Sequence, residues 1–591
     1  MAGSTAALLP CLLPCLLLQV LLGLSHGVET LSRSTESHQV SSLKSPLATR
    51  INLLSRSTAS HQVSSLKSPL ATRINLLSVD IPPLSQVPSL NALHLGLNAI
   101  SGTWCPCGRN ASSPCKGGPF NVTNDLLRLR PTMMRTHDSS LLTPTIYQNP
   151  STRPWGVRVF NWDSIYPDIT ADPTKQASYN FTNADLWKAQ FDNLNIPLLL
   201  RLGSSVNQGA ASTNISMSDV DNLSTAFLHF VKHFNDGWGG RPLLQHTTPL
   251  KIQYIEVWNE PEGAFWTGTI PTLHALLQLT ISKIRAYDAS LYVGPNSACP
   301  YGDCTNDPSH SDDGYEFDAL DAIINMTLSE DLLPNVYSWH EYIEQYPTLT
   351  NHLYNITKHK LMERNFSHVQ QIITEWNPCA EGSCLKPTEL NSWAAADFGQ
   401  TVMVHALLGV NVSMPYPLCA VNKDWGLVST EDDEEIGQSH MVKWRPQAFA
   451  FEMMSSVLRE TPYVFSGAVY PETPSLVDQK YLGVGFVNTN RTKINVVYVA
   501  RMSNSSLLKN ELRVELNHVG VAGATFQVAC SIIDDKDVPV GETKGCTFVN
   551  GTLMMDMTTK VQANGSVTFP FNFVAVSPSL LRLRLVQVWD M

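Results

Sequence analysis

Between about residues 95 and 455, short apolar runs alternate with stretches of helical periodicity, and this alternation constrains the fold most strongly. The apolar runs lie at 132–136, 196–202, 254–258, 291–294, 335–339 and 369–374. The amphipathic stretches lie at 186–194, 223–234, 272–287 and 392–408. Strands that alternate with helices indicate βαβ units and a parallel sheet. A region of about 360 residues suits an eight-stranded barrel with insertions better than one open sheet. We therefore predict an α/β fold, a (β/α)8 TIM barrel over 91–458.

The helical period disappears after this region. Short β-rich segments separated by turns follow at 481–487, 494–501, 512–516, 524–532 and 580–586. Several short strands at regular spacing are typical of a sandwich of two sheets. The sequence therefore predicts a C-terminal all-β sandwich domain over 459–591.

The N-terminal region has two parts. Residues 1–27 begin with a nearly continuous apolar run and end in small residues, which indicates a signal peptide. A basic n-region is missing and two prolines interrupt the run, so a signal anchor is the alternative. Residues 28–90 contain a tandem repeat of 23 residues, 31–53 and 54–76, whose copies differ only at Glu36 and Ala59. The repeat is rich in Ser, and two copies cannot form a solenoid, so we predict a low-complexity linker.

Sequons and cysteines both indicate the secretory route. Cys299 with Cys304, Cys379 with Cys384, and Cys530 with Cys546 are close pairs, typical of disulfides in an oxidising compartment. The pairing of Cys105, Cys107, Cys115 and Cys419 is left open. We predict a glycoprotein that is extracellular or lies in the lumen of the secretory-lysosomal route. The Asn-X-Ser/Thr sequons number thirteen, at Asn110, Asn121, Asn180, Asn214, Asn222, Asn325, Asn355, Asn365, Asn411, Asn490, Asn504, Asn550 and Asn564.

Charge and motifs exclude several classes of protein. The 40 basic and 51 acidic residues sum to −11, and no cluster of Lys and Arg is dense enough for a nucleic-acid partner. No segment after the signal approaches 18 uninterrupted apolar residues, so we expect no membrane span in the mature chain. No zinc spacing, phosphate loop or dinucleotide loop is present, so we expect neither a metal nor a cofactor. The oligomeric state is left open.

Two glutamates carry the chemistry. Glu260 ends the stretch Tyr254-Ile255-Glu256-Val257-Trp258-Asn259-Glu260, and the following Pro261 stops the strand. Glu375 ends the apolar strand 369–374 in the same way, followed by an aromatic residue, an Asn and a Pro. The two glutamates are 115 residues apart. At about 31 residues per βα unit this spacing is three to four units, so the strands can be the fourth and the seventh.

Two carboxyl groups that face one cleft are the minimum equipment for glycoside hydrolysis. One must stay protonated to give its proton to the leaving oxygen, and the other must stay ionised to attack the anomeric carbon. A separation of about 5–5.5 Å leads to retention through a covalent glycosyl-enzyme.

The chain resembles the clan of retaining β/α-barrel glycosidases, whose members carry Asn-Glu after strand four and Glu after strand seven. Within that clan it is similar to glycoside hydrolase family 39, which includes β-xylosidases and α-L-iduronidases. The resemblance spans roughly 95–460. It also rests on the stretches 134–138, 178–182, 196–203, 293–295, 338–342, 425–428 and 445–449.

The resemblance implies a role for each matching residue. Glu260 would be the general acid/base, and Glu375 the nucleophile. Asn259 would bind the substrate 2-hydroxyl, and Arg135 would keep Glu375 ionised. The other implied substrate-binding residues are His340 and Tyr342 beside the nucleophile, His137 at the sugar hydroxyls, and Trp376 and Trp425 as stacking platforms. A structural role is the alternative for Arg135 and His340, and a place in the core is the alternative for each Trp.

The predicted protein is a secreted retaining glycosidase that acts on an oligosaccharide or glycoside. Two alternatives stay open: a catalytically inactive carbohydrate-binding barrel, and a glucosidase, glucuronidase or iduronidase from another family of the clan. No basic residue directly follows the fifth strand at 295–297. An acidic sugar would need one, so a neutral sugar such as xylose is favoured.

Overall fold

The structure is a computed structural model of the 591-residue chain. It describes residues 73–80, 93–99, 101–105, 119–149, 156–203, 215–240, 249–261, 265–266, 268–297, 319–342, 348–377, 392–415, 418–419, 426–429, 443–465, 468–469, 481–500, 508–517, 524–533, 547–549, 552–554, 557–560, 562, 567–575 and 579–588. The predicted signal peptide, most of the predicted linker, and Trp425 lie outside these residues.

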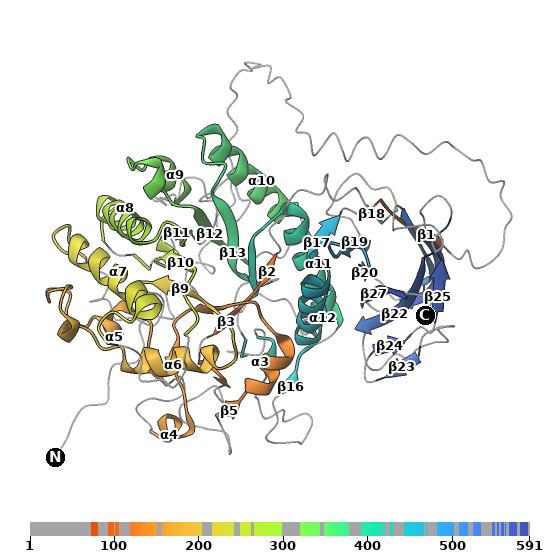
Figure 1. The fold of residues 1–591 in the computed structure, drawn as a ribbon, viewed down its shortest axis with the longest axis horizontal. Coiled ribbons are helices and arrows are strands. Elements are labelled where there is room, and N and C mark those ends of the chain that lie inside the picture. The colour runs from red at the N-terminus through yellow and green to blue at the C-terminus, as the bar shows by residue number, and fades with distance from the viewer. Residues whose placement is uncertain are drawn as a thin grey trace, which may run out of the picture. The chain divides into compact units, whose positions relative to one another are not determined.

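A parallel barrel forms the larger part of the described chain, as the alternation predicts (Figure 1). In spatial order its strands are β2, β14, β13, β12, β11, β10, β9, β6 and β3. Their bounds are β2 His94–Leu95, β3 Leu97–Ala99, β6 Met134–Thr136, β9 Leu198–Leu202, β10 Tyr254–Val257, β11 Tyr292–Ser297, β12 Val336–Tyr342, β13 Gln370–Asn377 and β14 Val412–Pro415.

The first strand of the barrel is divided between β2 and β3 at Gly96. Its first half pairs with β14, the last strand, and its second half pairs with β6. A side chain at Gly96 would lie 2.9 Å from the carbonyl oxygen of Met133, so only glycine permits this close approach. Counted from this divided strand, β10 is the fourth strand and β13 the seventh, as predicted from the spacing of the two glutamates.

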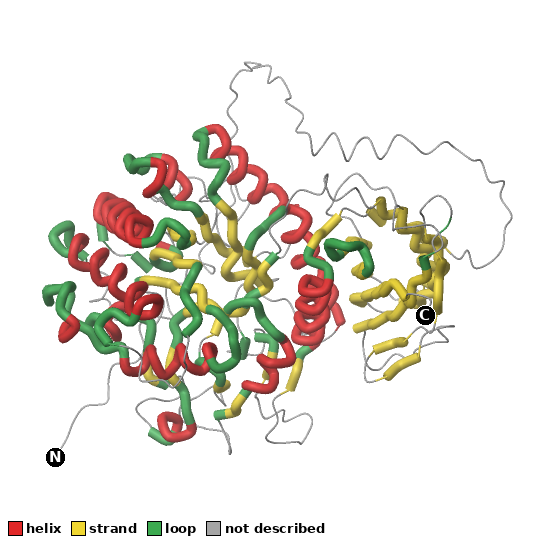
Figure 2. The backbone as a smooth tube through the Cα atoms, viewed as in Figure 1, coloured by secondary structure: helices red, strands yellow, loops and turns green. Residues whose placement is uncertain are grey.

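Helices surround the barrel strands (Figure 2). The helix α8, Ile270–Tyr287, begins where the Thr269 hydroxyl accepts the Thr272 N–H, with Pro271 in its first turn. The helix α7 ends at Gly237 in the left-handed conformation. The helices are α3 Thr123–Leu129, α4 Pro144–Tyr147, α5 Trp162–Ile165, α6 Thr182–Asp192, α7 Val220–Asp236, α8, α9 Ala319–Ile324, α10 Thr348–Glu363, α11 Ser392–Leu408 and α12 Pro446–Glu460. Among the described residues, no helix combines the length and the apolarity needed to cross a bilayer.

Alternation along the strands separates the apolar base of the barrel from its polar upper layer. Tyr254 belongs to a small buried apolar cluster contributed by five strands of the barrel and by Met133, which directly precedes β6. Glu256, two residues further along β10, shares its face, since side chains alternate along a strand. The cluster therefore closes the base of the barrel below the polar residues. Its members are Met133, Leu199, Tyr254, Val336, Ile372, Val412 and Met414.

A disulfide joins the segments that follow the first and the last strands of the barrel. Cys105, at the end of β4 Trp104–Cys105, pairs with Cys419 across 314 residues of sequence. The Leu418 N–H also donates to the Asn98 carbonyl oxygen at 3.1 Å. This disulfide settles two of the four cysteines that the sequence left open. Each of the three predicted close pairs includes at least one cysteine outside the described residues.

The C-terminal region is all-β, as predicted. One antiparallel sheet has the order β17, β19, β20, β27, β22 and β25. A second, mixed sheet has the order β18, β1 (Arg73–Asp80), β21 and β26, in which β1 and β21 are parallel. Their bounds are β17 Tyr463–Phe465, β18 Ala468–Val469, β19 Tyr481–Val487, β20 Lys493–Ala500, β21 Leu508–Asn517, β22 Thr525–Ile533, β25 Met557–Lys560, β26 Val567–Ala575 and β27 Ser579–Val588. A further hairpin joins β23 Thr547–Val549 and β24 Thr552–Met554.

The strand β1, Arg73–Asp80, comes from the predicted linker and corrects that prediction. It pairs in parallel with β21 over all eight of its residues and begins inside the second copy of the repeat. The sequence of this short run contains Ile74 and Val79, residue types that favour strands. The prediction of a linker over 28–90 is therefore wrong for these residues. The second copy is followed by Leu77-Ser78-Val79-Asp80, whereas the first copy is followed by Leu54-Ser55-Arg56-Ser57, so the two continuations differ after Leu-Ser.

Candidate active site

Glu260 lies beyond the C-terminal end of the fourth strand, three residues after Val257, the last residue of β10. Its backbone has a φ of 39°, and Trp258, two residues earlier, has a φ of 72°. Both values are in the left-handed region, which is unusual for residues other than glycine. Hydrogen bonds hold the turn, because the Trp258 N–H donates to the Leu202 carbonyl and the Glu260 N–H donates to Asn296 Oδ1 at 2.9 Å. The strained turn directs the Glu260 carboxyl group toward the barrel axis.

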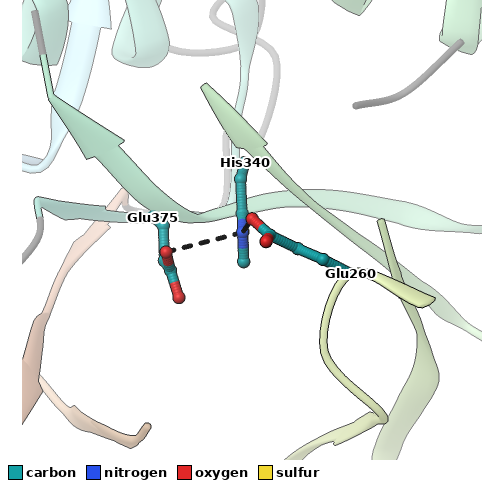
Figure 3. A group of neighbouring side chains, drawn as sticks. All are labelled: Glu260, His340 and Glu375. Atoms are coloured by element: carbon teal, nitrogen blue, oxygen red, sulfur yellow. Dashed lines mark hydrogen bonds and ion pairs between the residues drawn. The ribbon is translucent and has the colours of Figure 1, made fainter. Parts of the chain in front are cut away.

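Glu375 lies within β13, at the same end of the barrel. The register between β12 and β13 shifts after Trp339, so that His340 lies opposite Glu375. Such an irregularity redirects side chains at the rim of a barrel. One oxygen of Glu375, one oxygen of Glu260 and one ring nitrogen of His340 all lie within 4.8 Å of one another. Figure 3 shows the two carboxyl groups beside the imidazole ring of His340.

Three side chains hold the carboxylate of Glu375. Arg135 Nη1 donates to Oε1 at 2.5 Å, and His137 Nε2 lies 2.8 Å from the same oxygen. The Tyr342 hydroxyl donates to Oε2 at 2.5 Å. Burial by itself raises the pKa of the Glu375 carboxyl, but His137, His340 and Arg135 overcome this effect and hold its pKa well below the usual value. Glu375 is therefore ionised at neutral pH.

His340 connects the two carboxyl groups, and its neighbours define its tautomer. Its Nε2 lies 3.0 Å from Asn296 Nδ2 and 3.3 Å from Arg135 Nη2. Both neighbours present only N–H groups, because the amide of Asn296 is oriented by the bond from the Glu260 N–H to its oxygen. Nε2 therefore accepts, and a ring proton lies on Nδ1. From there it donates to Glu260 Oε1 at 2.5 Å and lies 3.5 Å from Glu375 Oε2.

The two carboxyl groups differ in environment. The Glu260 side chain is 18% exposed and that of Glu375 is 5% exposed. Glu375 accepts from three side chains, one of them a fully charged guanidinium, whereas Glu260 accepts from one imidazole. A buried, charge-stabilised carboxylate beside a more open carboxyl group can divide the work of nucleophile and proton donor.

Arg135 is the centre of the buried polar network beneath these residues. Its Nε donates to Glu256 Oε2 at 2.6 Å, and its Nη2 donates to Asn259 Oδ1 at 2.8 Å. Its Nη1, which binds Glu375, also lies 3.2 Å from Asn98 Oδ1. Burial lowers the pKa of Arg135, but Glu256 and Glu375 more than compensate and raise its pKa. The guanidinium is therefore fixed and charged.

The structure brings together most of the residues that the sequence predicts for the site. Asn259 is buried and reaches Arg135, and Tyr342 and Arg135 bind Glu375 directly. His137 also lies against Glu375. His340 binds Glu260 more closely than Glu375, whereas the sequence places it beside the nucleophile. Trp425 lies outside the described residues.

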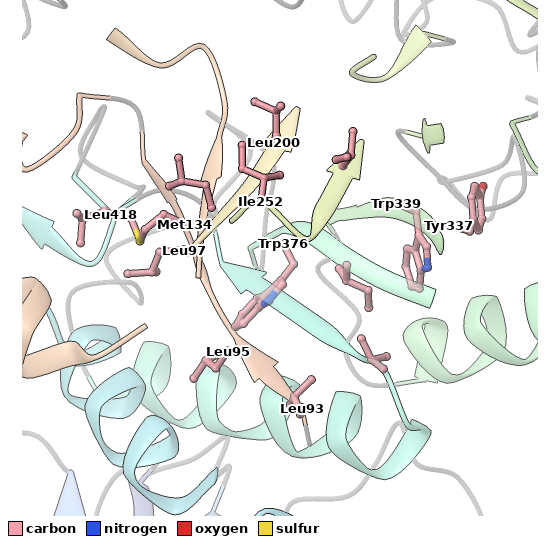
Figure 4. Packing of buried hydrophobic residues seen from close by; sticks show 14 of the residues in the cluster. Leu93, Leu95, Leu97, Met134, Leu200, Ile252, Tyr337, Trp339, Trp376 and Leu418 are labelled. Carbon is pink, nitrogen blue, oxygen red and sulfur yellow. The ribbon is translucent and has the colours of Figure 1, made fainter. Parts of the chain in front are cut away.

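Trp376 does not face the site, so its prediction as a sugar-stacking platform is wrong. Because side chains alternate along a strand, the residue after an inward Glu375 points outward. Its ring is 1% exposed, lies 5.0 Å from the Phe398 ring, and donates from Nε1 to Ser413 Oγ at 2.9 Å. Figure 4 shows Trp376 among the buried apolar residues, with Leu95 and Leu93 nearby. Trp376 is a core aromatic residue.

Several residues of the site were not predicted from the sequence. Asn296, at the end of β11, binds both Glu260 and His340. Glu256, in the middle of β10, is fully buried, as are Asn98, Ser338 and Thr374. The signal for Glu256 was a charged residue inside an otherwise apolar strand, which is rare unless the charge is paired. The hydroxyl and amide residues carry no comparable signal.

Within the part of the chain that the structure describes, Glu260, His340 and Glu375 form a group that could hold a metal ion, since they offer one ring nitrogen and two carboxylate oxygens. The hydrogen bonds oppose this use. His340 Nδ1 carries a proton in the tautomer that its neighbours define, and Glu375 lies against the cation of Arg135. A metal ion would have to displace that proton and share Glu375 with the guanidinium. The arrangement is better suited to acid–base and nucleophilic chemistry.

The chain shares its fold with solved structures of glycosidases, and the similarity covers most of its length. One is a glucosidase from Croceicoccus marinus, with a TM-score of 0.57 and 15% identity over 88% of this chain and 100% of that chain. Another is an α-L-arabinofuranosidase from Thermotoga maritima, with a TM-score of 0.54 and 12% identity over 87% of this chain and 100% of that chain.

A family 39 enzyme from Xanthomonas axonopodis pv. citri is also similar, with a TM-score of 0.49 and 13% identity over 88% of this chain and 98% of that chain. The sequence matches no protein-family model and no curated protein. At these identities the similarity establishes a shared fold, a barrel followed by an all-β domain, and the activity has to be judged from the site.

Proposed function

We propose that the protein is a retaining O-glycosidase with Glu375 as nucleophile and Glu260 as general acid/base. The observation that carries the proposal is the approach of the two carboxyl groups to within 4.8 Å at the C-terminal ends of the fourth and seventh strands. A short separation leaves no room for a water molecule between sugar and nucleophile, so it favours direct attack and retention. The glycosidase structures of the same fold support this proposal.

The reaction follows from the position of each group. A Glu375 oxygen attacks the anomeric carbon while the bond from that carbon to the leaving oxygen breaks, and Glu260 gives its proton to the leaving oxygen. A water molecule then attacks the same carbon. Glu260 takes a proton from this water, and the bond to Glu375 breaks, which restores both carboxyl groups. His340 donates to Oε1 of Glu260, so Oε2 is the oxygen available for proton transfer.

The proposed substrate is a glycoside of a neutral sugar, with a β-xylosidase-like specificity. The side chains of Arg135 and Arg201 are both fully buried. Arg135 is paired with Glu256 and Glu375, Arg201 binds Asp138 through Nη2, and both side chains are buried beneath the site, so neither is presented to the carboxylate of an acidic sugar. At the end of the fifth strand, Asn296 is engaged by Glu260 and His340. An arabinofuranosidase and a glucosidase of the same fold also act on neutral sugars, as their names state.

We further propose that the protein follows the secretory route, to the extracellular space or to a lysosomal lumen. The sequons support this proposal, since Asn121, Asn180, Asn325, Asn355, Asn365 and Asn490 are all exposed and available to a glycan. The disulfide between Cys105 and Cys419 fits an oxidising compartment.

A panel of chromogenic glycosides, including xylosides, arabinofuranosides, glucosides, glucuronides and iduronides, tests the activity and the sugar on purified protein. Labelling with a mechanism-based 2-fluoro-sugar then tests the nucleophile. We expect turnover of a neutral glycoside and a covalent adduct on the peptide that contains Glu375. An inert protein that binds sugars without forming an adduct would instead be the inactive carbohydrate-binding barrel. Turnover of uronides alone would contradict the proposed substrate.

A further inference from the structure

Glu256 is a buried glutamate that the proposed reaction does not use. It lies in the middle of β10, four residues before Glu260, and none of its surface is exposed. Its Oε2 accepts from Arg135 Nε at 2.6 Å, and its Oε1 accepts from the Ser338 hydroxyl. A buried carboxylate is costly unless it is paired and hydrogen-bonded, and both conditions are met here.

Arg135 is shared between two carboxylates through different nitrogens. Nε binds Glu256, whereas Nη1 binds Glu375. The remaining nitrogen, Nη2, binds Asn259 and approaches His340. Every edge of the guanidinium is therefore occupied, and the bond to Glu256 determines the angle at which the other two nitrogens meet the reacting residues. A shift of the guanidinium would move Glu375 and Asn259 together.

We propose that Glu256 is a positioning residue for the nucleophile, which orients Arg135 and offsets part of its charge so that Glu375 remains reactive. This inference rests on the proposed glycosidase function. When Glu375 forms its bond to the anomeric carbon, its negative charge disappears, and a buried guanidinium with no second carboxylate would be left uncompensated. Glu256 provides that second carboxylate, so the covalent intermediate keeps a paired arginine.

The electrostatic surroundings decide the sign of the effect. Burial raises the pKa of Glu256, but Arg135, His340 and the hydrogen bonds from Ser338 and Thr374 outweigh this effect and lower the pKa below its usual value. Glu256 is therefore ionised. Loss of its charge would leave the positive charge of Arg135 acting on Glu375 alone. The pKa of Glu375 would then fall, and its carboxylate would become a weaker nucleophile. The titratable and charged groups around the two glutamates are Arg135, His137 and Asp138 from β6 and the residues after it, Arg201 from β9, Glu260 after β10, and His340 and Tyr342 from β12.

The test compares the pH dependence of kcat/KM for the wild type, Glu256→Gln and Glu256→Asp, on the best substrate of the glycoside panel. For Glu256→Gln we expect the acidic limb to move to lower pH by about one unit. We also expect its rate of inactivation by the 2-fluoro-sugar, which reports formation of the glycosyl-enzyme, to fall by about 10- to 100-fold. For Glu256→Asp the charge is kept and only the position changes, so the rate should fall while the limb stays in place.

Glu341→Gln is the matched control. Glu341 lies on β12 and its side chain is fully buried like that of Glu256, but it binds Thr350 and His405 rather than Arg135. This variant reports what removal of a buried carboxylate does to folding. The acidic limb of its pH profile for kcat/KM should stay in place. Thermal unfolding of all variants shows which are folded. An unmoved acidic limb in folded Glu256→Gln, or equal shifts of the limb in Glu256→Gln and Glu341→Gln, would overturn the inference. The proposed function would then still stand, provided that the wild type is active. A wild type without turnover would overturn the proposed function itself.

Discussion

Asn296 donates a hydrogen bond to His340, with Nδ2 3.0 Å from Nε2, and this contact, together with the approach of Arg135 Nη2 at 3.3 Å, leaves the ring proton on Nδ1, the nitrogen that faces Glu260. The other end of the same amide accepts the Glu260 N–H. Asn296 therefore supports Glu260, the proposed acid/base, in two ways: it binds the Glu260 backbone N–H, and it orients His340, which binds the Glu260 carboxyl group. Its Nδ2 also donates to the Ser338 hydroxyl at 2.8 Å. Because its other two contacts both act on Glu260, loss of Asn296 should affect most strongly the reactions that need proton transfer.

The first prediction concerns Asn296→Asp. The substitution keeps an acceptor for the Glu260 N–H but replaces the donor toward His340 with a second acceptor, so the ring must carry a proton on Nε2. We expect kcat/KM to fall by about 10- to 100-fold for glycosides with poor leaving groups. The loss should be several-fold smaller for dinitrophenyl glycosides, whose departure needs no proton. Steady-state kinetics on the two substrate types measure this difference, and equal losses would mean that Asn296 acts elsewhere.

The second prediction concerns Glu260→Ala. Without the proton donor, turnover of poor leaving groups should fall by about 100- to 10,000-fold, whereas activated substrates should still form the glycosyl-enzyme. Because the intermediate then lacks a base to activate water, azide should rescue turnover and yield a glycosyl azide of retained configuration. Product analysis by NMR checks the configuration. Glu375→Ala is the control. Azide should not yield a glycosyl azide of retained configuration from this variant, since it cannot form the intermediate.

The third prediction is the position of the acidic limb in wild-type enzyme. The pKa of Glu375 is held well below its usual value of 4.5 by His137, His340 and Arg135, against the opposing effect of burial. A depressed pKa keeps the carboxylate ionised as the pH falls, so kcat/KM should not be lost until the pH is below 4.5. A pH-rate profile in overlapping buffers measures the limb. A nucleophile limb above that value in a fully folded protein would contradict the hydrogen bonds described for Glu375.

The fourth prediction concerns Trp376→Phe. Because Trp376 lies in the core and donates to Ser413, its replacement should cost stability, by about 1–3 kcal/mol in the free energy of unfolding. KM should stay close to the wild-type value, since the ring does not reach the sugar. Chemical denaturation and steady-state kinetics give the two quantities. A raised KM with unchanged stability would restore the sugar-stacking role that the structure argues against.

The fifth prediction separates one sequon from the others. Asn411 is only 8% exposed, its N–H donates to the Gln371 carbonyl, and Ser413 of the same sequon accepts from Trp376. Asn355 and Asn365 are exposed. In active protein from eukaryotic cells, peptide mapping after enzymatic deglycosylation should find Asn411 unoccupied and the two exposed sites occupied. A glycan on Asn411 of folded protein would contradict the placement of β14.

Local pattern in the sequence determined the order of the elements and the ends of the strands. The alternation of apolar runs and helical stretches predicted the barrel, and the Pro stops after Glu260 and Glu375 placed both glutamates at one end of it. These features depend on neighbours within a few residues, where periodicity and proline act directly. The same pattern failed for Arg73–Asp80, whose partner strand, β21, lies more than 400 residues later in the chain.

Tertiary structure alone decided which side chains meet. Arg135 lies between Glu256 and Glu375 only because the barrel closes and its strands adopt one register, and the shift after Trp339 brings His340 opposite Glu375. The bond between Cys105 and Cys419 spans the same closure. Trp376 follows the nucleophile in sequence, yet the pleat of the strand turns it into the core. Facing and register are properties of the whole sheet, because a shift of one residue moves every side chain to the opposite face.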